Sequence, residues 1–193
     1  MIAIILDTNI VTESHRGRKR LEKISKCVVS LLMSLFELSK SDKIVLVVCY
    51  SKTKRELRRE SISLFEKRIR SRLCEELGGI RGLRLKSLSK IVSRNVYEDI
   101  RRVVLSDRSM LRTLRDIVKG AKNVDLAESN IIKEVDEDIH LFLKALYMYR
   151  GARLVKIVTG DCKARDNLLS LMNGLRDRCG EDFKIDVFYV NIQ

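Results

Sequence analysis

The chain contains no proline and no tryptophan, and aromatic residues make up 5% of its 193 residues. Because no proline marks an interdomain linker, we expect one domain that spans residues 1–193. The scarcity of aromatic residues means that strong stacking on nucleic-acid bases is not indicated. No stretch of 18 apolar residues could span a bilayer. The opening MIAIILD is short and lacks the basic start of a signal peptide, so we expect a cytoplasmic protein.

Several common site types are also missing. The five cysteines form no CxxC pair and no Cys/His cluster with zinc spacing. We expect reduced thiols, with a Cys162–Cys179 disulfide as the open alternative if the source is a hyperthermophile. No GxxxxGK[ST] sequence is present, which excludes a P-loop. His15 and His140 are isolated, so we expect ordinary loop and helix residues rather than catalytic groups.

Positive charge is in excess and is unevenly distributed. The chain has 39 Lys and Arg against 26 Asp and Glu, a net charge of +13. Residues 51–125 hold 21 Lys and Arg against 10 Asp and Glu, which is +11 of that excess. Solvated helix faces are one explanation, but ordinary surfaces mix both signs, and a cationic block favours contacts with phosphate. We therefore expect nucleic acid as the partner, and no membrane association.

The order of apolar segments indicates the fold class. Three apolar runs predict buried strands, at residues 2–6, 44–49 and 154–158, and a last strand is predicted near residues 185–190. Three segments have helical spacing: residues 21–38, 136–150 and 164–178. Strands that alternate with helices favour right-handed parallel crossovers. The predicted fold is α/β, three-layered and Rossmann-like, with a central, mostly parallel sheet of four to five strands.

The predicted basic region lies in the middle of the chain. Residues 13–20 are polar and basic and predict a loop, and a long charged helix is predicted from residue 53 to about residue 77. Further helical patterns follow to Gly120, so we expect a basic helical insertion at about residues 58–125. The basic side chains predicted to contact nucleic acid lie near its start and beside Asp161: Lys52, Lys54, Arg55, Arg58, Arg59, Lys163 and Arg165.

Four acidic residues fall where this fold would gather them. Asp7 and Asp161 directly follow apolar strands, while Glu56 and Asp138 lie in the first turns of predicted helices at the same edge. In open α/β sheets, ligands bind beyond the carboxyl ends of the strands. Clustered carboxylates repel one another, so they need a cation or a shared proton, and oxygen ligands suit Mg²⁺ or Mn²⁺. Such a site can hydrolyse a phosphodiester.

Each of the four carboxylates has a structural alternative or a nearby rival. An Asp at the end of a strand commonly caps the next turn, which is the alternative for Asp7. Neighbouring carboxylates could replace the other three: Glu60 for Glu56, Asp136 or Glu137 for Asp138, and Asp166 for Asp161.

The order and spacing of these residues resemble those of PIN-domain nucleases. The opening strand is followed by the DTN sequence of residues 7–9, and a Glu-Leu pair at residues 56–57 follows the second strand. Asp138 opens an apolar helix, and a later strand ends in the TGD sequence of residues 159–161. The similarity covers roughly residues 1–57 and 136–193, and the middle of the chain does not match.

This resemblance implies a PIN fold and a metal-dependent endoribonuclease. It implies that four residues bind Mg²⁺ or Mn²⁺ directly or through water: Asp7, Glu56, Asp138 and Asp161. Asn9 and Thr159 would be polar supports, with Asp136 and Asp166 as further acidic neighbours. Attack by water would leave a 5′-phosphate and a 3′-hydroxyl.

Other functions and partners stay open. Proteins of this type often form homodimers, and some are toxins with an antitoxin partner, although the length of this chain favours a free-standing enzyme. A non-catalytic RNA-binding module in an RNA-processing assembly and a structure-specific DNA nuclease are the alternative functions. An Asp-x-Asp phosphatase is disfavoured because Asn9 stands where its second carboxylate would be.

Overall fold

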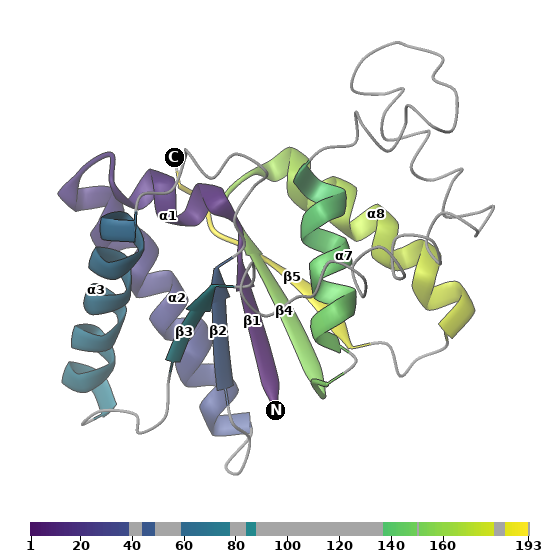
Figure 1. The fold of residues 1–193 in the computed structure, drawn as a ribbon, viewed down its shortest axis with the longest axis horizontal. Helices are drawn as coiled ribbons and strands as arrows, with labels where there is room; N and C mark the ends of the chain where they lie inside the picture. The colour runs from purple at the N-terminus through teal and green to yellow at the C-terminus, as the bar shows by residue number, and fades with distance from the viewer. Residues whose placement is uncertain are drawn as a thin grey trace.

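One parallel sheet organises the protein. The computed structural model describes residues 1–38, 44–48, 59–77, 84–87, 137–149, 151–179 and 184–192. Its strands are β1 (Ile2–Leu6), β2 (Ile44–Val48), β3 (Arg84–Ser87), β4 (Leu154–Thr159) and β5 (Ile185–Tyr189). They form a sheet in the order β3-β2-β1-β4-β5, and every pair of neighbours is parallel (Figure 1). This is the strand order of a doubly wound sheet, so the predicted Rossmann-like α/β class is confirmed.

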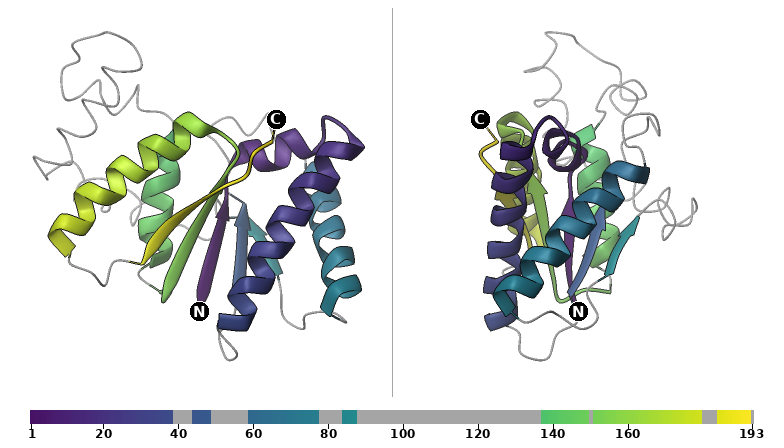
Figure 2. Two further views of the ribbon diagram at one scale, coloured as in Figure 1. Left: turned by 180° about the vertical axis from the view of Figure 1, so that it is seen from behind. Right: turned by 90° about the vertical axis from the view of Figure 1, so that its left-hand side faces the viewer.

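Helices cover both faces of the sheet (Figure 2). One face carries α1 (Thr8–Ser14), α2 (Arg18–Leu38) and α3 (Arg59–Leu77), and the other carries α7 (Glu137–Tyr149) and α8 (Cys162–Cys179). Successive side chains of a strand point to opposite faces. Ala3 and Ile5 accordingly pack in the cluster under α7 and α8, while Ile4 and Leu6 pack under α1, α2 and α3. Both faces of β1 are therefore buried, which explains its continuous apolar run.

The prediction of a loop at residues 13–20 is wrong in part. Helix α1 runs to Ser14, and α2 already begins at Arg18. Asp7 adopts an extended conformation at the start of α1, and Ile10 and Val11 are fully buried against the sheet. This short helix is held by packing, which a polar sequence pattern does not reveal.

Strand β3 was not predicted. It pairs with β2 from Val45–Arg84 to Val48–Ser87 and forms one edge of the sheet in the described part of the chain. Its sequence, RLKS, contains two basic residues, which are typical of an edge strand and break the apolar pattern.

Helix α3 and β3 fall inside the span 58–125 that was predicted as an insertion. Helix α3 packs on α2 and buries Phe65, Ile69 and Leu73 in the same cluster as β1. This part of the span therefore belongs to the sheet and its cover. Arg59 is the first residue of α3. Several predicted residues lie outside the described ranges: Lys52, Lys54, Arg55, Glu56, Arg58 and Asp136.

Helix α7 is strongly apolar because it packs directly on the sheet. Its residues Leu141, Phe142, Ala145 and Met148 are buried with strand residues of β1 and β4. It has 13 residues, fewer than the roughly 20 that cross a bilayer. Across the described ranges, no helix combines the length and the apolar character that a membrane span requires.

The alternative of a Cys162–Cys179 disulfide is wrong. The two residues are the first and last of α8, and Cys162 carries a free thiol. At 1.5 Å per residue their Cα atoms are separated by roughly 25 Å, whereas a disulfide requires less than about 7 Å.

An ion-pair cluster joins α2 to α3. The carboxylate of Glu22 pairs with Arg68 through Oε1 and with Arg72 through Oε2. The hydrogen bond from Arg72 and the charges of both guanidinium groups hold the pKa of Glu22 below its ordinary value, although burial opposes this shift. The side chain of Glu22 is 32% exposed, so solvent screens the pairs and their contribution to stability is small.

We expect Glu22→Gln to lower the melting temperature slightly at neutral pH. The pKa of Glu22 is depressed in the folded state, so its stabilising effect is present above the ordinary value of 4.5 and is lost as the pH falls through the folded-state value. Thermal unfolding of both proteins from neutral to acid pH measures the difference, which should shrink. Glu66→Gln, which removes one pair within α3, is the control. A difference that is constant with pH would contradict the role of these charges.

Candidate functional site

The carboxyl ends of β1 and β4 meet at the topological switch point of the sheet. After β1 the chain crosses to β2 over one face, and it reaches β4 through α7 on the other face. Strands β1 and β4 pair along their length, and the Asp7 amide donates to the Val158 carbonyl at 2.9 Å. The loops that follow these strands therefore lie side by side, where open α/β sheets bind ligands.

Thr159 is the centre of a hydrogen-bond network at this edge. Its hydroxyl donates to Asp7 Oδ2 at 2.7 Å. The Thr159 hydroxyl oxygen also accepts hydrogen bonds, from Asn9 Nδ2 at 3.2 Å and from the Asp161 amide at 3.1 Å. A hydroxyl has one donor and two acceptor positions, so all of its hydrogen-bonding capacity is used. Thr159 is 0% exposed, which keeps water from competing for these contacts.

Asn9, in the first turn of α1, connects this helix to the loop after β4. Its Nδ2 donates to Asp7 Oδ2 at 2.8 Å, and its Oδ1 accepts from the Gly160 amide at 3.0 Å. Asp7 Oδ2 thus receives hydrogen bonds from both Asn9 and Thr159. Two donors on one oxygen fix the plane of the carboxylate, as the supporting groups of a metal ligand do.

Asp161 caps helix α8. Its Oδ1 accepts from the amides of Lys163 at 2.8 Å and Ala164 at 3.3 Å, which would otherwise lack partners in the first turn. The side chain is exposed, and within the described ranges Oδ2 accepts no hydrogen bond. The cap therefore leaves the second oxygen available to another ligand.

The backbone of Asp138 lies at the same edge of the sheet. It is the second residue of α7, and α7 leads into β4 through a turn in which the Gly151 amide donates to the Met148 carbonyl at 3.1 Å. Helix α7 therefore runs opposite to the strands, and its first turn lies at their carboxyl ends (Figure 1). The structure brings Asp7, Asn9 and Thr159 into direct contact and joins Asp161 to them through its amide.

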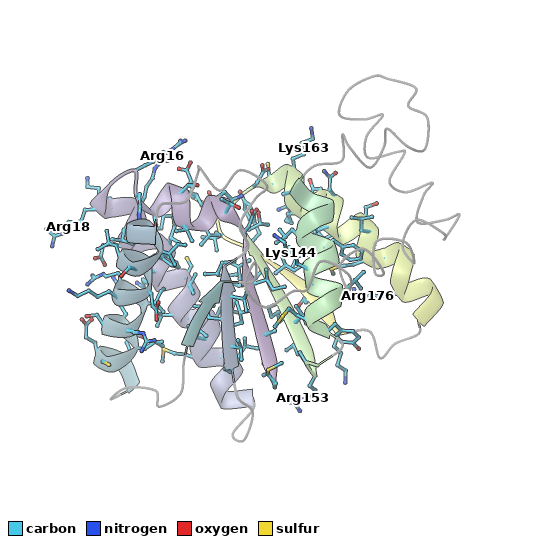
Figure 3. The ribbon with its side chains drawn as sticks, in the orientation of Figure 1. Arg16, Arg18, Lys144, Arg153, Lys163 and Arg176 are labelled. Carbon is cyan, nitrogen blue, oxygen red and sulfur yellow. The ribbon has the colours of Figure 1, made fainter. Side chains whose placement is uncertain are left out.

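Asp166 and Arg165 engage each other at the start of α8. The Arg165 guanidinium pairs with Asp166 Oδ1 at 2.8 Å. It also lies 4.9 Å from the centre of the Tyr189 ring, a cation–π contact. Arg165 thus already has two partners. Lys163 is exposed at the carboxyl edge and pairs with no carboxylate of the described residues (Figure 3).

A pocket of about 340 Å³ opens beside Asp161. Its walls come from α1, α2, the start of α8 and the end of β5, and they include Asn9, Glu13, Arg20, Asp161, Tyr189 and Ile192. Glu13 pairs with Arg20 and, at 2.9 Å, with Arg16. A Cβ atom on Gly160 would lie 1.7 Å from Ile192 Cδ1, so glycine at this position allows Ile192 to form the pocket wall.

Three residues that line this pocket were not predicted from the sequence: Glu13, Arg20 and Tyr189. Tyr189 is the last residue of β5, and parallel strands all end at one edge, so its position at a strand end was a usable signal. The pairing of Glu13 with Arg20 depends on the corner between α1 and α2, which was predicted as a loop.

The donor chemistry of this edge fits Mg²⁺ or Mn²⁺. Carboxylates are hard oxygen ligands, and Mg²⁺ is usually held by one or two of them together with water and substrate phosphates. Asp7 and Asp161 supply two carboxylates at the edge. In the part of the chain that the structure describes, no group of three or more His, Cys, Asp or Glu side chains could hold a metal ion. An ion here would therefore depend on water and phosphate, or on ligands from other residues.

Comparisons with known proteins show no family for this chain. No protein-family model and no curated protein matches the chain. A cyclodipeptide synthetase from Mycobacterium tuberculosis matches at 16% identity over 87% of this chain and 77% of that one, with a TM-score of 0.42. Structural likeness at this level carries no argument about activity.

We expect Thr159→Val to destabilise the fold by about 1–3 kcal/mol. The change removes the acceptor of the Asp161 amide and one of the hydrogen-bond donors to Asp7 Oδ2. Thr159→Ser keeps the hydroxyl and removes one methyl group, so its cost should be about 1 kcal/mol. Chemical denaturation of the three proteins measures both changes. A Thr159→Val protein that is as stable as wild type would show that the hydroxyl contributes nothing.

Proposed function

We propose that this protein is a metal-dependent endoribonuclease that hydrolyses RNA phosphodiester bonds with Mg²⁺ or Mn²⁺. The main support is the carboxylate of Asp7, fixed by Asn9 and Thr159 at the switch point of the sheet. Asp161 lies beside it with one oxygen outside the cap. The resemblance to PIN-domain nucleases points to the same residues.

In this proposal Asp7 and Asp161 hold the ion, and Asp138 and Glu56 are further ligands. A bound divalent ion polarises the phosphodiester and lowers the pKa of an attacking water. Asn9 and Thr159 maintain the orientation of Asp7 through their hydrogen bonds to Oδ2. Because the network is complete without a ligand, the carboxylate needs no reorganisation when substrate arrives.

Basic side chains border the same edge. Arg16, from the α1–α2 corner, and Lys163, from α8, lie along the upper rim of the molecule in Figure 3, and Arg18 lies at its left-hand end. Arg18, Lys19 and Lys163 are exposed, and none of them pairs with a carboxylate in the described ranges. A polyanion that crosses the carboxyl edge would meet these cations, in keeping with the net charge of +13.

A non-catalytic RNA-binding module is the second candidate. Asp161 and Arg165 already have structural roles as a helix cap and as a partner of Tyr189, and such roles need no chemistry. A DNA nuclease is the third, because contacts with phosphate do not distinguish the two sugars. Cleavage assays on RNA and DNA substrates separate all three.

We expect Asp7→Asn to reduce RNA cleavage by roughly 100-fold or more while the protein stays folded, because the amide keeps the shape but weakens ion binding. The assay uses single-stranded and structured RNAs with Mg²⁺, Mn²⁺ or a chelator. Asp186→Asn is the matched control: it makes the same change on β5, where Asp186 pairs with Lys156.

Three results would redirect the proposal. Intact RNA with wild-type protein in both metals, together with unchanged RNA affinity in Asp7→Asn, would favour the binding module. Cleavage of single-stranded or flap DNA without cleavage of RNA would favour the DNA nuclease. Equal cleavage by wild type and Asp7→Asn would remove Asp7 from the site.

We expect Arg18→Ala and Lys163→Ala each to lower the salt dependence of RNA binding, because each lost phosphate contact reduces the slope of log K against log salt by about 1. Arg153→Ala is the control, since Arg153 precedes β4 at the opposite end of the sheet (Figure 3). Binding isotherms at several salt concentrations give the slopes. If all three variants keep the wild-type slope, RNA does not cross the carboxyl edge.

A further inference from the structure

The pocket beside Asp161 is lined by an aromatic residue, Tyr189, that the proposed chemistry does not use. Tyr189 ends β5 and is paired in register with Thr159 of β4. The Val190 amide donates to the Thr159 carbonyl at 2.8 Å, which anchors the backbone that carries the ring. The backbone of Tyr189 is therefore fixed one strand away from the Asp7–Asn9–Thr159 network.

One side of this ring is already covered. The Arg165 guanidinium lies 4.9 Å from the ring centre and is held by Asp166. Arg165 is not among the residues that line the pocket, whereas Tyr189 is. Arg165 thus covers one face of the ring, and Tyr189 also contributes to the pocket wall.

The remaining walls combine apolar and polar groups. Ile192 is an apolar wall beside Gly160, which has no side chain. Glu13 and Arg20, paired with each other, present hydrogen-bond acceptors and donors. The volume of about 340 Å³ is near the lower limit for ligand sites, which suits one small planar group with a polar edge.

We propose that this pocket binds one nucleobase of the RNA substrate, stacked on Tyr189 and with its polar edge toward Glu13 and Arg20. The inference rests on the proposed function and adds a base-recognition subsite to it. The pocket shares Asn9 and Asp161 with the candidate site, so a base held there brings its phosphate to the carboxylates. The chain has few aromatic residues, but stacking a single base needs only one well-placed ring.

The test uses a set of short single-stranded RNAs, each with the fluorescent base 2-aminopurine at a different position, in the presence of a chelator to prevent cleavage. Wild-type protein should quench the fluorescence at one position, because stacking on an aromatic ring quenches this base. Tyr189→Ala should lose that quenching and bind roughly tenfold more weakly. Tyr189→Phe keeps the ring and should behave as wild type.

Two controls guard against a folding artefact. Tyr189→Leu fills the space without an aromatic ring and should lose quenching as Tyr189→Ala does, even if the alanine variant is unstable. An abasic strand of the same length should bind wild type and Tyr189→Leu equally, because its contacts are to phosphate. Thermal unfolding of each variant confirms that it is folded.

The base site and the nuclease activity can fail independently of each other. Wild-type quenching in Tyr189→Leu would overturn the base site, even if RNA is cleaved in Mn²⁺. Quenching that requires the ring, in a protein that leaves RNA intact in both metals, would support the base site and overturn the nuclease. No quenching at any position in wild type would also overturn the base site.

Discussion

The parallel pairing of β1 with β4 is the constraint on which the candidate site depends. Asp7 and Thr159 are 152 positions apart in the chain, yet their side chains are 2.7 Å apart because Leu6 is paired with Val158. A slip of one residue would turn every side chain of β1 to the other face of the sheet. The two hydrophobic clusters prevent this slip, since alternate residues of β1 are buried in different clusters. Core packing thereby sets the geometry of a polar network at the sheet's edge.

The sequence predicts those parts of the fold in which local pattern and tertiary packing agree. β1, β2 and β4 are the inner strands of the sheet, and their apolar residues are buried because helices cover both of its faces. β5 was also predicted, although it lies at an edge of the described sheet. The pattern fails for β3, an edge strand with two basic residues, and for the seven-residue helix α1. Neither element is formed by local sequence preference alone. The first depends on hydrogen bonds to β2, and the second on burial of Ile10 and Val11.

Strand direction alone was enough to place Asp7, Asn9, Thr159 and Asp161 at one edge. Parallel strands end together, so residues that follow them must be neighbours. The division of roles was not predictable, because it depends on where side chains point. Arg165, predicted to contact nucleic acid, lies over Tyr189 and pairs with Asp166, and one carboxylate oxygen of Asp161 accepts hydrogen bonds from the first turn of α8. The metal role of the carboxylates stays a prediction.

Asp161 would have two roles in the proposed enzyme, as the cap of α8 and as a ligand of the cation. Its Oδ1 is committed to the amides of Lys163 and Ala164, so a cation would share a carboxylate that already compensates a helix terminus. The described residues at this edge include no group of three metal ligands. Oxygen atoms from a substrate phosphate would complete such a coordination shell, and the positive charge of Lys163 and Arg18 would balance the remaining phosphate charge. The bound ion and the RNA phosphate would therefore stabilise each other at this edge, because the phosphate supplies ligands to the ion and the ion neutralises phosphate charge.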